Sequence, residues 1–244
     1  MALKFSDFIP PVIVKAARRS AGVIQAIYTR CRFKVTRDDY NAEQYWRERH
    51  VRHGYNSLRG VGNACLGEDE NHAWYTSARL IFEGVLNDLA LGPGIRAMEL
   101  GYGTGFYTRI LYERGVRDCL ALDIVDQHLP YVKKDMPEYY FQKCDIGSEA
   151  VDHPGCQLIY MIDVSQHIVN DDKLRFCLLH NVGQNLAPGG VFIVTDELKN
   201  QRYSFYEKSR TMDFYKKILG YETAYEPVQF RDKYLFAFRK GGKD

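Results

Sequence analysis

The sequence lacks the features that would place it in a specialised class. No run approaches the roughly 20 uncharged apolar residues of a membrane-spanning helix, which argues against an integral membrane protein. None of its six cysteines forms a C-x-x-C pair or a zinc-like pairing with histidine, so we expect reduced core thiols in a cytoplasmic protein. Neither an internal repeat nor a low-complexity tract is present. With 244 residues, 45% of them hydrophobic, the composition is that of a globular protein with one core.

Acidic residues are scarce at the start of the chain. Residues 1–37 hold eight basic residues and one acid, a net charge of +7, whereas the remainder carries −5. A nucleic-acid enzyme usually spreads positive charge over its main domain, so we expect no nucleic-acid partner. The apolar run at 8–14 precedes Lys15, Arg18 and Arg19 instead of following them, which is the wrong order for a cleavable secretion signal.

Residues 1–37 are predicted to form a basic amphipathic leader. On a helical wheel, Lys15, Arg18, Arg19 and Arg30 lie opposite a face of apolar and small side chains. That face consists of Ile13, Ala17, Ser20, Ile24, Ile27, Tyr28 and Cys31. Such a face packs on its own domain, lies on an anionic membrane surface or docks on a partner enzyme, and the sequence does not choose among these.

The rest of the chain divides into two regions of different pattern. In residues 38–92, aromatic and aliphatic side chains recur at helical spacings, and a loop is expected at 57–63. In residues 93–244, short apolar strands alternate with helices, which predicts an α/β fold with a parallel sheet and crossover helices. Two final strands, at 222–228 and 234–239, predict an antiparallel hairpin at the C-terminal end.

A glycine-rich segment follows the first strand of this second region. Gly101, Gly103 and Gly105 alternate between a predicted strand and a predicted helix, and Glu99 precedes them. Glycine lets the backbone approach a ligand closely. The spacing differs from the G-x-G-x-x-G of dinucleotide loops, and no phosphate-binding lysine follows. An acid and a compact glycine turn suit a ligand that has an amine and no pyrophosphate.

Acidic residues stand at the ends of the next two strands. Asp123 is placed to hydrogen-bond ribose hydroxyls, the role of an acid at this position in nucleoside-cofactor sites. Asp145 is placed to reach an adenine amino group. A strand-terminal Asp alone is often only a helix cap, but together with the glycine loop these acids indicate a nucleoside cofactor.

On these residues, the region 96–239 resembles the class I S-adenosylmethionine-dependent methyltransferases. The resemblance implies a Rossmann-like, seven-stranded, mostly parallel sheet with helices on both faces, an antiparallel C-terminal hairpin and an N-terminal helical extension. It implies that residues 93–244 bind S-adenosylmethionine as the cofactor and that residues 38–92 form a helical cap or lid. The implied cofactor-binding residues are Glu99, Gly101, Gly103, Gly105, Asp123, Ile124, Asp145, Ile146 and Met161.

A finer resemblance concerns two short segments, residues 4–11 and 45–49. They look like segments of bacterial methyltransferases that act in surface-polysaccharide or other glycan assembly. This resemblance implies an O-methyltransferase whose acceptor is a sugar or glycan hydroxyl, while another small-molecule acceptor stays open. We also expect residues 1–37 to be available for contact with a glycosyltransferase or with the inner face of the membrane.

Catalytic residues are expected at the carboxyl ends of the later strands, where ligands gather in open α/β sheets. His167 is the first candidate for a general base, because an imidazole with a pKa of about 6.5 is mostly neutral at pH 7. Asp163 would act as the base or orient His167, and His167 alternatively only starts a helix or packs on the cofactor. Asp196 and Glu197 are further candidates for binding acceptor hydroxyls. We expect no metal, although acids near these strand ends would suit magnesium.

Aromatic residues of the helical region give a possible lid, and two other functions stay open. Trp46, Trp74 and Tyr75 cover the cofactor or belong to the core. A nicotinamide-dependent oxidoreductase would need a G-x-G-x-x-G loop, which is lacking, and a Tyr-x-x-x-Lys pair, which the segments expected to be catalytic, around 163–167 and 196–197, do not contain. A catalytically silent methyltransferase-like subunit would keep the fold and dock a partner through its leader.

Overall fold

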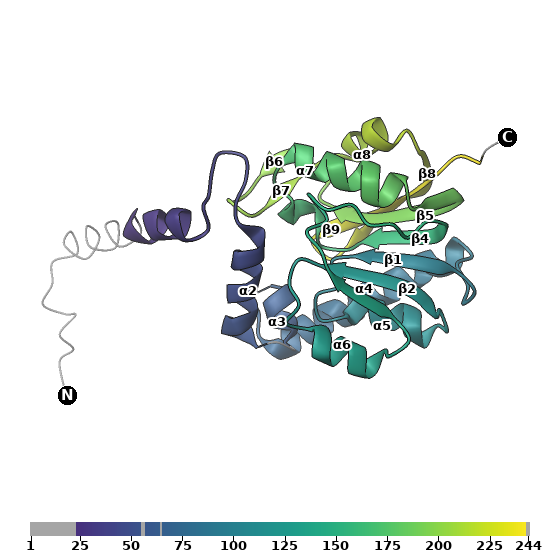
Figure 1. Ribbon diagram of the computed structural model, residues 1–244, viewed down its shortest axis with the longest axis horizontal. Helices are drawn as coiled ribbons and strands as arrows, with labels where there is room; N and C mark the ends of the chain where they lie inside the picture. Colours follow the sequence, from purple (N-terminus) through teal and green to yellow (C-terminus); the bar gives the residue numbers. More distant parts are fainter. Residues whose placement is uncertain (1–22, 55–56, 64, 243–244) are drawn as a thin grey trace, which may run out of the picture.

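A single mixed sheet forms the centre of the molecule (Figure 1), whose computed structural model describes residues 23–54, 57–63 and 65–242. The strands of this sheet are β1 (Arg96–Leu100), β2 (Asp118–Asp123), β3 (Tyr140–Lys143), β4 (Cys156–Met161), β5 (Leu186–Asp196), β8 (Glu222–Phe230) and β9 (Lys233–Arg239). Their order is β3-β2-β1-β4-β5-β9-β8. Strand β9 runs antiparallel to both of its neighbours, β5 and β8, and the other pairs of this sheet are parallel, so the expected sheet and C-terminal hairpin are confirmed.

The strand order reverses between β1 and β4. From β1 the chain winds outward through β2 and β3, and it then returns to pair β4 with the other side of β1. In open parallel sheets, such a reversal opens a crevice beyond the carboxyl ends of the two strands, because their connections leave in opposite directions. The topology therefore places a binding crevice beside the glycine turn that follows β1.

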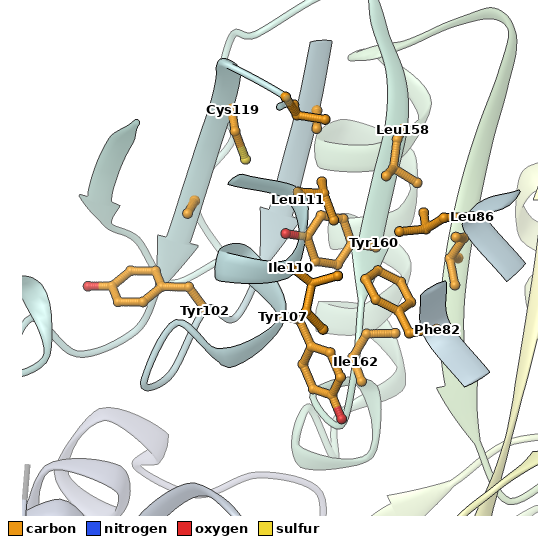
Figure 2. Close-up of a cluster of buried hydrophobic side chains, with 14 of the residues drawn as sticks. Phe82, Leu86, Tyr102, Tyr107, Ile110, Leu111, Cys119, Leu158, Tyr160 and Ile162 are labelled. Atoms are coloured by element: carbon orange, nitrogen blue, oxygen red, sulfur yellow. The ribbon is translucent and has the colours of Figure 1, made fainter. Parts of the chain in front are cut away.

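Helices lie on both faces of the sheet (Figure 1). On one face are α4 (Glu68–Asp88), α5 (Phe106–Glu113) and α6 (Leu129–Asp135), and on the other are α7 (Asp171–Phe176), the π-helical turn Cys177–Gly183 and α8 (Met212–Leu219). Figure 2 shows Phe82 and Leu86 of α4 meeting Ile110 of α5 and Tyr160 of β4 in one fully buried cluster. Since α4 packs directly on the sheet, it contributes to the main core.

The remaining helices of the 38–92 region lie over the crevice end of the sheet. Helix α2 (Ala42–His53) begins at Asn41, whose side chain accepts the Gln44 N–H at 3.0 Å. Helix α3 (Leu58–Val61) occupies most of the segment expected to be a loop, because the Ser57 hydroxyl caps its first turn. Arg49 joins the two helices through Nε and Nη2, which donate to the carbonyls of Gly60 at 2.7 Å and Gly62 at 2.6 Å.

Of the leader, residues 23–37 belong to the described part, while its first 22 residues lie outside it. Residues 23–32 are helical and project from the body (Figure 1). Ile24, Ile27 and Tyr28 are 67%, 58% and 57% exposed, so this part of the apolar face does not pack on its own domain. Phe33 anchors the end of the leader by stacking on Phe205, with ring centroids 6.0 Å apart. Among the described helices, none has the length and apolar character needed to cross a membrane.

Candidate active site

The turn after β1 depends on its three glycines. Gly101, Gly103 and Gly105 have φ angles of +91°, +50° and +78°, in the region that side-chain-bearing residues rarely adopt. A Cβ atom on Gly101 would lie 2.3 Å from a methyl carbon of Val164, in the turn after β4. The glycine turn therefore lies against the β4 turn with no space for a side chain between them.

Asp123 completes this turn from the end of β2. Its carboxylate accepts the backbone N–H groups of Gly103 at 2.8 Å and Val125 at 3.0 Å. Burial raises the pKa of Asp123 to about 6. Each carboxylate oxygen has two lone pairs, so the group retains acceptor capacity for hydroxyls of a bound ligand.

Glu99 supports the turn from below. It is fully enclosed and accepts the Tyr160 hydroxyl at 2.9 Å and the Thr108 hydroxyl of α5. Burial raises the pKa of Glu99 to about 8. Glu99 thus links β1, β4 and α5 beneath the turn and does not itself line the cavity above.

A first cavity of about 290 Å³ opens above the glycine turn. Six residues expected to bind the cofactor line it, together with both expected catalytic residues, His167 and Asp163. The six are Gly101, Gly103, Asp123, Ile124, Asp145 and Ile146. Met161 instead lies in the core on the other face of the sheet, and the next residue, Ile162, lines the cavity, because side chains alternate along a strand.

Two of the expected cofactor residues are structural in part. Gly105 forms the left-handed N-cap of α5, where a Cβ would lie 2.8 Å from a Val132 methyl carbon, so its role is to let α5 pack on α6. Asp145 lines the cavity, but its carboxylate also accepts the Gly147 N–H at 3.1 Å and the Ser148 hydroxyl at 2.8 Å.

Side chains from the 38–92 region also line the first cavity. Trp46 and His50 of α2, Val61 of α3 and Tyr75 of α4 all line it. Of the three aromatic residues expected in a lid, Trp46 and Tyr75 therefore reach the first cavity, and Trp74 lines a second one instead. Trp46 also packs edge-on against His167, with ring centroids 4.8 Å apart.

His167 ends the short 3-10 helix η2 (Ser165–His167) that follows β4. Its Nδ1 lies 3.0 Å from the backbone carbonyl of Tyr206, which only accepts, so Nδ1 carries the proton. Its Nε2 then has the lone pair and accepts from the Gln166 amide at 3.3 Å. Burial, followed by the positive charge of Lys233, lowers the pKa of His167 to about 3. The ring is consequently neutral at physiological pH, and it is a weaker base than the free imidazole on which the prediction relied.

Asp163 does not make the orienting contact with His167 that the sequence suggested, because its carboxylate is ion-paired elsewhere. It pairs with the guanidinium of Arg231 and lies 3.3 Å from the ammonium of Lys233. Its backbone adopts φ +60°, and its N–H donates to the Thr195 hydroxyl at 2.8 Å. The Tyr206 carbonyl fixes the His167 ring instead.

A second cavity of about 270 Å³ adjoins the first. The two share Trp46, Val61, Asp163 and His167. Tyr206 and Glu207 also line it, from the connection between β6 (Gln201–Arg202) and β7 (Lys208–Ser209). His167 thus stands on the boundary between a cavity at the glycine turn and a cavity that reaches the C-terminal hairpin.

Asp196 and Glu197, the other acceptor candidates, line neither cavity. Asp196 is buried and accepts the Tyr215 hydroxyl at 2.6 Å, and Glu197 accepts the Tyr203 hydroxyl. Within the described ranges, no three His, Cys, Asp or Glu side chains form a group that could hold a metal ion. The sequence did not point to Tyr206, Glu207, Arg231 or Lys233, because no motif marks them and they enter the site from distant segments.

Comparison with known proteins places this geometry in a fold class. No protein-family model and no curated protein matches the sequence. Solved structures with the same fold include the N-methyltransferase NodS of Bradyrhizobium japonicum WM9 bound to S-adenosylhomocysteine. NodS has 16% sequence identity and a TM-score of 0.59, and the similarity covers 82% of this chain and 98% of NodS. The chain therefore has the fold of S-adenosylmethionine-dependent methyltransferases.

Two further similar structures show the range of substrates in this fold. Magnesium protoporphyrin IX methyltransferase of Synechocystis PCC 6803, bound to S-adenosylhomocysteine, has 14% identity and a TM-score of 0.59, covering 80% of this chain and 94% of that one. The amino-pentose methyltransferase CalS10 of Micromonospora echinaspora, bound to S-adenosylmethionine, has 13% sequence identity and a TM-score of 0.54. The similarity covers 68% of this chain and 91% of CalS10. These neighbours act on varied substrates, so they lend no support to the finer polysaccharide resemblance.

Proposed function

We propose that this protein is an S-adenosylmethionine-dependent methyltransferase. The observation that carries the proposal is the meeting of two cavities at His167, one lined by the glycine turn and Asp123 and the other by residues from the cap and the C-terminal hairpin. When bound, S-adenosylmethionine supplies an electrophilic methyl group. The residues that would hold it are Gly101 and Gly103 for the methionine part, Asp123 for the ribose, and Asp145 with Ile146 for the adenine.

The composition of the first cavity fits this cofactor. Gly101 and Gly103 line the cavity without side chains, and packing against Val164 excludes any larger residue at Gly101, so their backbone is accessible to a ligand. The half-buried carboxylate of Asp123 offers acceptors at the strand end where ribose hydroxyls bind in this fold. Cys144 and Ile146 supply an apolar wall beside Asp145 for a flat base.

We further propose that the acceptor is a hydroxyl group on a sugar, glycan or other small molecule in the second cavity. Tyr206 holds the neutral His167 ring with its Nε2 lone pair available. An acceptor hydroxyl can replace the 3.3 Å contact from Gln166 and pass its proton to Nε2 as the new bond forms. Trp46 and Trp74 give flat apolar walls beside charged side chains, a combination that suits a sugar.

The exposed helix of the leader supports a further part of the proposal. Ile24, Ile27 and Tyr28 present apolar surface, and residues 1–37 carry a net charge of +7. We propose that the leader contacts an anionic membrane surface or a glycosyltransferase in bacterial surface-polysaccharide biosynthesis, from the cytoplasmic side. Flotation with vesicles containing anionic lipid tests the membrane part. Binding that persists after Ile24→Glu and Ile27→Glu would contradict it.

Cofactor binding is tested by calorimetry with S-adenosylmethionine, S-adenosylhomocysteine, NAD and NADP added separately. We expect binding of the first two only. Asp123→Asn should weaken S-adenosylhomocysteine binding about tenfold, through the loss of a charge-assisted hydrogen bond. Asp126→Asn, an exposed neighbour, serves as the matched control and should bind as the wild type does. Binding of a nicotinamide nucleotide alone would contradict the proposal.

The acceptor is tested by transfer of an isotopically labelled methyl group to a panel of sugars, glycans, amines and phenols. The position of the label in the product, read by NMR, separates O-methylation from N-methylation. Labelling of an amine alone would contradict the hydroxyl assignment. Binding of the cofactor without turnover on any compound in the panel would instead favour a silent subunit.

A further inference from the structure

The second cavity has two buried cations at the end that faces the C-terminal hairpin. Arg231 lies in the turn between β8 and β9, and Lys233 begins β9. Their side chains are only 2% and 8% exposed, yet both residues line the cavity. Asp163 is the acid that pairs with them, and a single carboxylate neutralises one of the two charges. Arg231 and Lys233 therefore share a single directly paired carboxylate.

Arg231 also has hydrogen-bond donors without acceptors. Its guanidinium carbon lies 4.3 Å from the ring centre of Trp74 and 5.0 Å from that of Tyr75. Aromatic faces attract the cation but do not accept in-plane N–H bonds as a carboxylate does. Nε and Nη1 are buried and have no hydrogen-bond partner among the described residues. Leaving such donors unsatisfied is unfavourable, and an anionic oxygen could satisfy them after a small side-chain adjustment.

The other acids that line the cavity, Asp232 and Glu207, act on Lys233 only through longer-range charge, which opposes the lowering of the Lys233 pKa by burial. Glu207 and Asp232 line the cavity, but no hydrogen bond or ion pair among the described residues joins either to Arg231 or Lys233. Burial raises the pKa of Glu207, which favours its neutral form. Arg49 is already committed to backbone carbonyls of α3 and its following loop. Of the cations in the described residues that line the cavity, Arg231 and Lys233 are the two placed to hold a ligand anion.

We propose that this end of the second cavity binds an anionic oxygen group of the methyl acceptor, a carboxylate or a phosphate, with Arg231 and Lys233 as its ligands. The inference rests on the proposed function and narrows its substrate class to acidic acceptors. The anionic group is held beside the hairpin while the hydroxyl to be methylated faces His167. Arg231 supplies directional N–H donors, and Lys233 supplies a compact charge.

The test uses the intrinsic fluorescence of the wild-type protein. The chain has two tryptophans, Trp46 and Trp74, and both line the second cavity. D-glucuronate, inorganic phosphate and D-glucose are titrated separately at constant ionic strength, with and without S-adenosylhomocysteine. We expect a saturable change with glucuronate, phosphate or both, and none with glucose. The tighter of the two anions identifies the group. No saturable change with either anion would overturn the inference.

A variant pair assigns the effect to the proposed ligands. Lys233→Met keeps the unbranched side chain, removes the charge, and should weaken anion binding about tenfold. Lys199→Met, at an exposed lysine outside both cavities, should leave it unchanged. Equal affinities in the two variants would overturn the inference. Calorimetry with S-adenosylhomocysteine on the same samples separates the two proposals: cofactor binding without anion binding contradicts only this inference, and the converse contradicts only the proposed function.

Discussion

The two cavities that meet at His167 are built in different ways. The first is made chiefly from the ends of β1, β2, β3 and β4, which follow one another between Arg96 and Met161 and lie side by side because these strands are parallel. The second combines α2, α3, α4, the β4 turn, the β6–β7 connection and the β8–β9 turn. The first cavity thus follows from the topology of the sheet, whereas the second depends on how separate loops and helices pack together.

Removing the His167 imidazole should produce the largest effect, because His167 belongs to both cavities. His167→Ala should lower turnover roughly 100-fold, the contribution of a general base, and leave S-adenosylhomocysteine affinity within about threefold. Steady-state kinetics and calorimetry measure the two quantities. His72→Ala, at an exposed histidine of α4, is the control. A turnover loss below about threefold would remove His167 from the role of base.

The next effect concerns the first cavity alone. Gly101→Ala forces a Cβ to within 2.3 Å of a Val164 methyl carbon and strains a backbone at φ +91°. We expect S-adenosylhomocysteine affinity to fall about 30-fold, which corresponds to about 2 kcal/mol of strain. Gly94→Ala, where nothing lies within 4 Å of the added atom, should bind normally. Unchanged affinity in Gly101→Ala would mean that the turn does not form the binding cradle.

The smallest expected effect is on the free energy of unfolding and concerns Glu99, which lies beneath the glycine turn. The pKa of Glu99 is about 8 in the folded protein, above its unfolded value of about 4.3. The folded state therefore binds more protons between these values, and wild-type stability falls as pH rises through this range. Glu99→Gln does not titrate, so its free energy of unfolding relative to wild type should rise by about 1 kcal/mol or more from pH 4 to pH 8.

Urea unfolding at several pH values measures this difference. Glu226→Gln, at an exposed glutamate of β8, should show no such trend and serves as the control. A difference between Glu99→Gln and wild type that is flat with pH would show that Glu99 stays ionised beneath the turn. In that case Glu99 would place a negative charge beneath the first cavity and would also hold the glycine turn through its hydrogen bonds.

Much of the fold and of the first cavity could be predicted from the sequence because both follow from local periodicity. Alternating strands and helices fix the parallel sheet, and residues at successive strand ends, such as Gly101 and Asp123, then necessarily converge. Met161 shows the limit of this reasoning. A shift of one residue along a strand reverses the direction of the side chain, so Ile162 faces the cavity and Met161 the core.

The second cavity could not be predicted because its residues are joined by tertiary packing and not by spacing. Arg231 lies 68 positions after Asp163, and Tyr206 lies 39 positions after His167, yet each pair is in contact. The loop predicted at residues 57–63 also differs from the structure. The segment from Ser57 to Asn63 has the glycines of a loop, but a serine cap and the contacts from Arg49 stabilise a short helix there.

The most direct test of two cavities meeting at His167 is a crystal structure of the protein with S-adenosylhomocysteine. We expect the ribose hydroxyls to contact Asp123, the base to lie beside Ile146, and the sulfur to point toward the boundary with the second cavity near His167. Density for the ligand outside the first cavity, or with its sulfur directed away from His167, would contradict the account.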